Sequence, residues 1–209
     1  MGNIEISFDE EQLSEVEKLL GSLSKKAPNA ARSAINRTMT DAKKMLEKHI
    51  KDNYNLPPKK VSAAFSRTTA SQKDLNASIT IKGEPLELRE FKPVNAGNQG
   101  VLVKVKKNEA YKKFMPKLFW ADLPAGENRH HAIMQRSASG KQYKKEPFKT
   151  IRSSQKMDTT KIKKLIGPSI PGMVWGEGGA FESLRPNVQL MLQKHIDEAV
   201  KNLLNNTNK

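Results

Sequence analysis

The clearest helical pattern in the chain is SKKAPNAARSAINRTMTDAKKMLEKHIKDNYNLPP, residues 24–58. Small and apolar residues recur there every three or four positions, the spacing of one buried helix face: Ala31, Ile35, Thr38, Met39, Ala42, Leu46 and Ile50. Pro28 suits the first turn of a helix, whereas Pro57 and Pro58 end or restart it. Because the face is rich in alanine, we expect another element to pack closely against this helix.

On the N-terminal side of this helix the chain is acidic. Residues 1–23 contain one lysine and six acidic residues, and four apolar residues recur there at helical spacing: Leu13, Val16, Leu20 and Leu23. We therefore expect residues 1–23 to form an acidic helix or arm outside the main domain. Such an arm would dock on a basic surface of its own chain or of a neighbour, and its deletion should leave the fold intact.

Beyond Pro57 the pattern changes twice. The stretch PPKKVSAAF (57–65) predicts a second short helix. From residue 75 the apolar residues alternate, which is typical of strands. The stretches with this alternation are LNASITIKGEPLELREF (75–91, a hairpin turning near Gly83), GVLVKVKKN (100–108), KLFWADLPAG (117–126) and HHAIMQRSASGKQY (130–143).

The end of the chain is again helical in pattern. Apolar residues recur at helical spacing from about Pro186, which suits a first turn, and predict an amphipathic helix over 184–205. Helices, then strands, then a helix indicate an α+β fold. We predict N-terminal helices, a central, mainly antiparallel sheet of about four to six strands, and this long C-terminal helix. Residues 24–209 should form one domain that is helical over 24–66 and β-rich over 75–175.

The chain is strongly basic and contains no cysteine. Its 209 residues include 37 Lys and Arg against 22 Asp and Glu, a net charge of +15, and residues 24–166 hold 32 of the basic but only 12 of the acidic residues. This charge predicts an anionic partner, such as nucleic acid, a membrane surface or an acidic protein face. No apolar run approaches the 18 residues of a membrane span, and disulfides and thiolate metal sites are excluded.

A set of lysines interleaved with aromatic residues could contact this partner. Lysine binds phosphate as a point charge without reading bases, so we expect non-specific contact with nucleic acid or with an acidic partner. The candidate residues are Lys104, Lys106, Lys107, Lys112, Lys113, Lys141, Lys144 and Lys145. A solvated basic face is the alternative interpretation.

Signs of catalysis are few. His130 and His131 are adjacent, so in a strand they point to opposite faces and cannot share one metal. Asp122 and Glu127 nearby leave an enzyme using one of these histidines as a remote alternative, while His195 is expected to pack beside a helix face. No P-loop, nucleophile elbow or zinc-protease motif occurs. We therefore expect no enzyme, no cofactor and no metal.

Four stretches, in order, resemble the prophage minor tail protein Z family, the lambda-type tail completion proteins of long-tailed phages. They are APNAARSAINRTMTDAKKML, LPPKKVSAAFSRTTAS with LNASITIKGEPLELREFKP, HHAIMQRSASGKQY, and KKLIGPSIPGMV. The resemblance covers roughly residues 20–205. The insert RSSQKMDTTK (152–161) and the acidic residues 1–20 depart from the family pattern.

This resemblance implies a structural virion protein that acts at the head-proximal end of the tail and enables head–tail joining. The implied partners are the tail terminator, the tail tube proteins and the head–tail connector. A monomer in solution and a six-fold ring in the virion are expected, with assembly in the cytoplasm of the host bacterium and no membrane. A basic, non-specific nucleic-acid-binding protein is the alternative.

An uncharged stretch from Leu165 to Trp175 lies at the end of the basic region 24–166, just before the last helix. Its prolines are stiff and its glycines permissive, so it can carry an apolar surface from the sheet to the helix. If the protein forms a ring, the segment is a candidate subunit interface; otherwise it packs only within its own monomer. The candidate residues are Gly167, Pro168, Pro171, Gly172, Met173 and Trp175.

Overall fold

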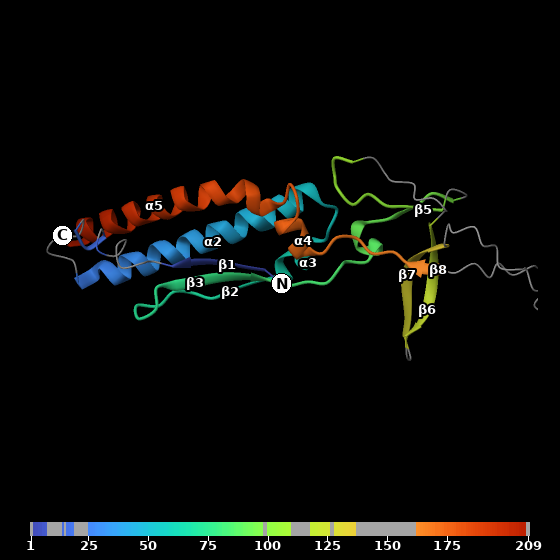
Figure 1. Ribbon diagram of the computed structural model, residues 1–209, viewed down its shortest axis with the longest axis horizontal. Helices are drawn as coiled ribbons and strands as arrows, with labels where there is room; N and C mark the ends of the chain where they lie inside the picture. The colour runs from blue at the N-terminus through green and yellow to red at the C-terminus, as the bar shows by residue number, and fades with distance from the viewer. Residues whose placement is uncertain are drawn as a thin grey trace, which may run out of the picture. The chain divides into compact units, whose positions relative to one another are not determined.

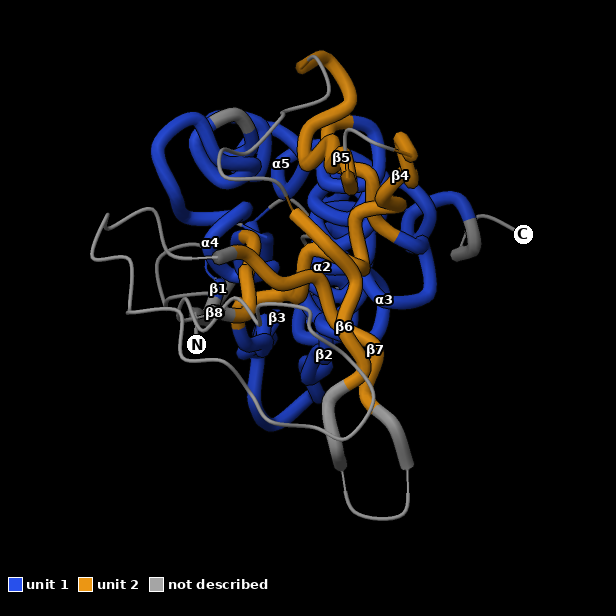
Figure 2. Tube along the Cα trace, turned by 90° about the vertical axis from the view of Figure 1, so that its right-hand side faces the viewer, with its two compact units in different colours: residues 1–52, 57–84, 168–209 blue, residues 53–56, 85–167 orange. Residues whose placement is uncertain are grey.

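The computed structural model of the chain describes residues 2–7, 14, 16–18, 25–97, 100–109, 118–125, 128–136 and 162–207. The chain divides into two compact units, which Figure 2 distinguishes by colour. Unit 1 comprises Met1–Asp52, Pro57–Glu84 and Pro168–Lys209, and unit 2 comprises Asn53–Leu56 and Pro85–Gly167. The expected single domain over residues 24–209 is therefore replaced by two units, because the β-rich part makes its contacts mainly within itself.

Unit 1 is built around the predicted long helix, α2 (Ala27–Asn53), and the C-terminal helix α5 (Ala180–Thr207), which lie side by side in Figure 1. The predicted face of α2 is buried, and its N-terminal half contributes only alanines to the cluster shared with α5. That cluster contains Val16, Ala27, Ala30, Ala34, Ile196, Ala199 and Val200. The alanine-rich face of α2 thus packs against side chains of α5.

Helix α5 begins earlier than its sequence pattern predicted. It starts at Ala180, so Pro186 lies inside the helix rather than in its first turn. Proline donates no backbone hydrogen bond, and Pro186 therefore leaves the carbonyl of Glu182 without its usual helical donor. Ala180 and Leu184 are both buried, at 0% and 4% exposure. We attribute the longer helix to this packing, which outweighs the cost of the internal proline.

A three-stranded antiparallel sheet completes unit 1. Its order is β1 (Gly2–Ser7), β3 (Asn76–Ile81) and β2 (Phe65–Arg67), and it lies along α2 in Figure 1. The predicted alternation in β3 is confirmed, because Ala77, Ile79 and Ile81 are buried. The predicted short helix after Pro57 is α3 (Pro58–Ala63).

The N-terminal residues are not separate from the domain, as the predicted arm would be. Strand β1 pairs with the whole of β3, from Gly2 opposite Ile81 to Ser7 opposite Asn76. Val16 lies in a helical stretch, is 2% exposed and belongs to the alanine cluster between α2 and α5. Both backbone pairing and apolar burial thus tie this part of the chain to unit 1.

Unit 2 contains the 3-10 helix η2 (Leu88–Phe91) and two small antiparallel sheets. One sheet pairs β4 (Val94–Asn95) with β5 (Val101–Leu102). The other has the order β6 (Leu118–Ala125), β7 (Asn128–Arg136) and β8 (Ile162–Lys164). The described strands thus form three small sheets in place of the predicted central one.

Pro85 explains part of this difference. The predicted hairpin partner of β3, around Leu86 and Leu88, does not return to β3. Proline cannot donate to a strand ladder, and the chain leaves unit 1 at Pro85. Glu87 forms an isolated antiparallel bridge with Ile166 instead, and Gly167 donates its backbone N–H to the carbonyl of Leu86 at 2.6 Å. Within unit 2, the entering and leaving segments therefore run side by side.

Candidate functional site

The densest set of ionic contacts in the described part of unit 2 converges on Glu87. Its Oε1 accepts from Lys164 Nζ at 2.8 Å, its Oε2 accepts from Arg89 Nε at 3.0 Å, and His130 Nε2 lies 3.0 Å from Oε2. These residues come from the entering segment, η2, β7 and β8. One carboxylate thus connects the segments that enter and leave unit 2 with its sheet.

The surroundings of Glu87 favour its ionised form. Burial alone would raise the pKa of Glu87, but hydrogen bonds from Lys164 and His130 and the positive charges of Arg89 and Lys164 outweigh it. The pKa of Glu87 is therefore lowered from its usual value. A carboxylate held ionised by several donors is a weak base, so we assign this set a structural rather than a proton-transferring role.

The second set lies on the opposite face of the same sheet. His131 Nδ1 is 2.5 Å from Asp122 Oδ1, and the imidazole stacks on Trp120 with ring centroids 4.4 Å apart and an angle of 11° between the planes. Asp122 and His131 are directly opposite each other in the β6–β7 register. Both side chains are about half exposed, at 49% and 54%, so water screens their attraction. The set orients the imidazole but does not bury it.

The two adjacent histidines thus behave as the strand pattern predicted. His130 contacts Glu87, whereas His131 contacts Asp122 on the other face of β7. The described residues contain no group of three or more His, Cys, Asp and Glu side chains that could hold a metal ion. Glu127, the other acid considered with these histidines, lies outside the described residues.

The candidate interface segment divides between a buried part and an accessible part. It forms a short helix, α4 (Ile170–Trp175), whose first turn is capped by Ser169 Oγ, which accepts from the Gly172 N–H at 3.1 Å. Pro171 and Met173 are buried, with Met173 at 1% exposure. They lie in the core of unit 1 and are not available to a neighbouring subunit.

The rest of that segment is more accessible. Trp175 is half-buried, as is Gly167, and Pro168 and Gly172 are exposed. Gly167 is in unit 2, where a Cβ atom at this position would lie 2.6 Å from Phe91 Cε2. The glycine is therefore required by the close approach of a buried aromatic ring. Of the apolar side chains proposed for the interface, Pro168 is exposed and Trp175 keeps partial access, whereas Pro171 and Met173 are buried.

Three of the eight candidate lysines lie within the described residues, and they follow β5. Lys106 and Lys107 are exposed and Lys104 is half-buried. Their backbone is held within unit 2 by the residues where α2 ends: Lys107 donates its N–H to Asn53 O at 2.8 Å, and Lys106 forms a bridge with Tyr54, the residue after α2. The other five fall outside the described residues: Lys112, Lys113, Lys141, Lys144 and Lys145.

Unit 1 contains a buried polar contact between its two long helices. Thr38 Oγ1 donates to Ala34 O at 2.9 Å and lies 3.0 Å from His195 Nδ1, while His195 Nε2 is 3.5 Å from Asp41 Oδ2. Since the single hydroxyl proton of Thr38 goes to Ala34, the geometry makes His195 Nδ1 the donor to Thr38. His195 is 7% exposed, which confirms that it packs within the helix interface.

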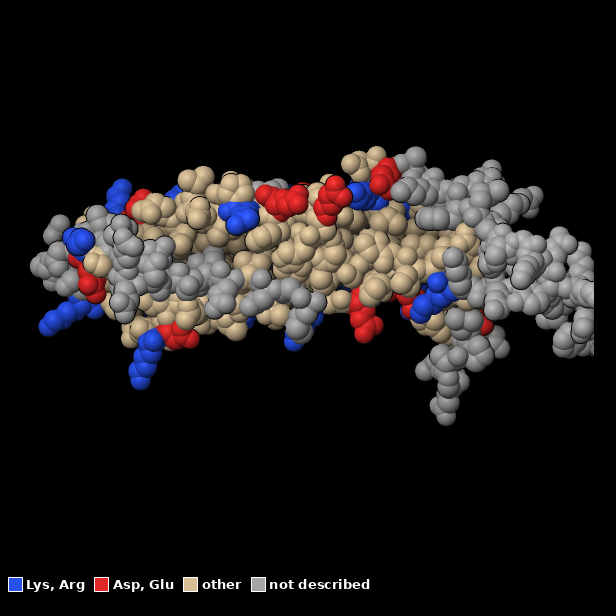
Figure 3. All heavy atoms as spheres, in the orientation of Figure 1, with Lys and Arg blue, Asp and Glu red and all other residues tan. Residues whose placement is uncertain are grey.

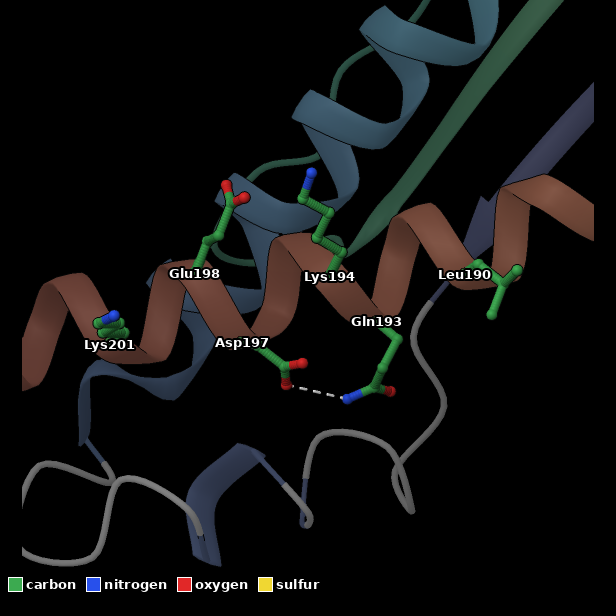
Figure 4. A pocket seen from close by; sticks show the side chains of 6 residues that line it. All are labelled: Leu190, Gln193, Lys194, Asp197, Glu198 and Lys201. Carbon is green, nitrogen blue, oxygen red and sulfur yellow. Dashed lines mark hydrogen bonds between the residues drawn. The ribbon is translucent and has the colours of Figure 1, made fainter.

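Helix α5 carries a hollow of about 470 Å³ whose described lining comes from this helix alone. Figure 4 shows its six side chains, which include the exposed Leu190 and a hydrogen bond of 3.1 Å from Gln193 Nε2 to Asp197 Oδ1. It is lined by side chains of mixed charge without convergent donors, and so lacks the features of a specific ligand site.

No model of a known protein family, no curated protein and no solved structure matches this chain. Among the described residues, none of the helices is long and apolar enough to cross a bilayer.

Proposed function

We propose that the chain is a structural virion protein that completes the phage tail at its head-proximal end and enables head–tail joining. One observation carries the proposal. The four stretches that resemble the tail completion family coincide with the elements that organise the structure. They are found in α2, in the segment from α3 to η2, in β7 for the described part of the third stretch (130–136), and from β8 to α4.

These stretches include three passages of the chain between the units. The second stretch contains the passages at Pro57 and Pro85, and the fourth contains the passage at Pro168. They also supply the buried face of α2, the central strand β3 and the buried side of α4. Similarity in such positions supports a shared architecture more strongly than similarity in surface loops, because these positions form the core and the passages between the two units.

Joining is tested by removing the gene from the phage that carries it. We expect DNA-filled heads and complete tails that remain separate, and purified protein added to the lysate should restore infectious particles. Electron microscopy of the joint should then show the chain as a six-fold ring beside the tail terminator. Normal infectious particles in the absence of the gene would contradict the proposal, as would a single copy at the joint.

The role of α4 in subunit contacts can be tested with a matched pair of variants. Trp175→Ala should change the free energy of unfolding of the isolated protein by no more than about 1 kcal/mol, because this side chain is only half-buried, while head–tail joining fails. Met173→Ala, two residues away and buried, should cost about 2–5 kcal/mol. If Trp175→Ala lowered the free energy of unfolding of the isolated protein by several kcal/mol, Trp175 would belong to the core of its own unit and not to a subunit interface.

A further inference from the structure

The division into units separates the charge of the chain. Unit 2 contains 19 Lys and Arg against 7 Asp and Glu, whereas unit 1 contains 18 against 15. The net charge is therefore +12 on the 87 residues of unit 2 and +3 on the 122 residues of unit 1. On the face of unit 1 drawn in Figure 3, acidic and basic side chains are interspersed. The positive field that attracts an anionic partner thus originates in unit 2.

Within the described part of unit 2, one group of lysines lies at one end of the β4–β5 hairpin. Val94 pairs with Leu102, so Lys92, which precedes β4, and Lys104, which follows β5, leave the hairpin at the same end. Lys106 and Lys107 come directly after. We name these four residues the hairpin cluster: Lys92, Lys104, Lys106 and Lys107.

The hairpin cluster is built into the fold, and three of its four lysines are exposed. Asn55 on the segment after α2 donates through Nδ2 to the carbonyl of Lys104 at 2.8 Å, and its own N–H donates to Val105 O at 3.0 Å. Arg89 and Lys164 are held by Glu87 and serve the internal ion cluster. Glu109 follows the hairpin cluster and is its acidic neighbour in sequence.

We infer that the hairpin cluster binds the phosphate backbone of duplex DNA without reading its sequence. Unit 2 contains 15 lysines but only 4 arginines. Protein–protein interfaces are depleted of lysine and enriched in arginine and aromatic residues, so this composition does not fit an acidic protein partner. Lysine is a flexible point charge that suits phosphates and does not read base edges as arginine does. This inference is independent of the role in tail completion.

The test measures binding of the full-length protein to a 30-base-pair duplex of arbitrary sequence by fluorescence anisotropy between 50 and 200 mM NaCl. The test variant is Lys106→Gln with Lys107→Gln. Each lost phosphate contact reduces the slope of log K against log salt by about 0.9. The double variant should therefore lower the magnitude of the slope by about 1.8. The ratio of the wild-type to the variant binding constant should then fall about twelvefold between 50 and 200 mM NaCl.

A matched control is the exposed lysine pair on α3 of unit 1, Lys59→Gln with Lys60→Gln. It removes the same charge and should leave the slope nearly unchanged. An equal decrease of the salt slope in the two double variants would overturn the assignment to the hairpin cluster. The absence of measurable DNA binding at 50 mM NaCl would also overturn it. Binding of poly-glutamate as tightly as DNA would identify an acidic polypeptide as the partner and would also overturn the inference.

Discussion

Replacing Gly167 by alanine tests how tightly the leaving segment of unit 2 is packed. The new Cβ would lie 2.6 Å from Phe91 Cε2 and 3.0 Å from Phe91 Cζ. Phe91 is 0% exposed, so its ring has no free space into which to retreat. Overpacking of a closed core costs about 1–3 kcal/mol, and we expect Gly167→Ala to lower the free energy of unfolding of unit 2 by that amount.

The two tryptophans of the chain allow each unit to be monitored separately, because Trp120 lies in unit 2 and Trp175 in unit 1. In a Trp175→Phe background, the fluorescence of Trp120 in a urea titration reports the unfolding of unit 2. Gly172→Ala in unit 1, monitored through Trp175 in a Trp120→Phe background, is the matched control, because its Cβ would meet only Ser169 Oγ, at 3.2 Å. Alanine also favours a helix over glycine. A change below about 0.5 kcal/mol for Gly167→Ala would refute the packing argument.

Three further predictions concern stability. Glu87→Gln should destabilise unit 2 by about 1–2 kcal/mol at pH 7. Because the pKa of Glu87 is lowered in the fold, the difference in stability between wild type and variant should be present above the usual carboxyl pKa of 4.5 and vanish as the pH falls through the lowered pKa. Urea titrations at several pH values would measure it. Val16→Ala should cost unit 1 about 1–3 kcal/mol, measured through Trp175 in a Trp120→Phe background, whereas a free arm would show no change. Thr38→Val should cost about 1–3 kcal/mol by leaving His195 Nδ1 buried without its acceptor, and a smaller loss in a His195→Leu background would confirm the pairing.

Periodicity predicted the elements whose pattern is decided by burial on one face. The α2 stripe and the alternation of β3 were both recognisable because one face of each is buried. The opposite orientation of His130 and His131 followed from strand geometry alone. Strand β1 was missed even though Ile4 and Ile6 alternate with polar residues, because the acidic residues after it dominated the interpretation of the N-terminus.

The Glu87 cluster had no local signal in the sequence. Glu87 is 43 residues from His130 and 77 residues from Lys164, and the bridge of Glu87 with Ile166, next to the paired strands β7 and β8, brings them together. Which of the three sheets a strand joins depends on where a proline removes a backbone hydrogen bond between strands, and on which strands pair in the folded chain. These are properties of tertiary pairing, and propensity in a single stretch does not specify them.

The discontinuity of unit 1 has a consequence for protein synthesis. Between the end of α2 at Asn53 and the start of α5 at Ala180 lie 126 residues, which a ribosome translates in about 6–25 s. During this interval the alanine face of α2 lacks its covering helix, while residues 85–167 of unit 2 are made as one continuous segment. We expect unit 2 to fold first and unit 1 to close only after α5 has been made. Chains truncated before α5 would keep this apolar face exposed and depend on chaperones to remain soluble.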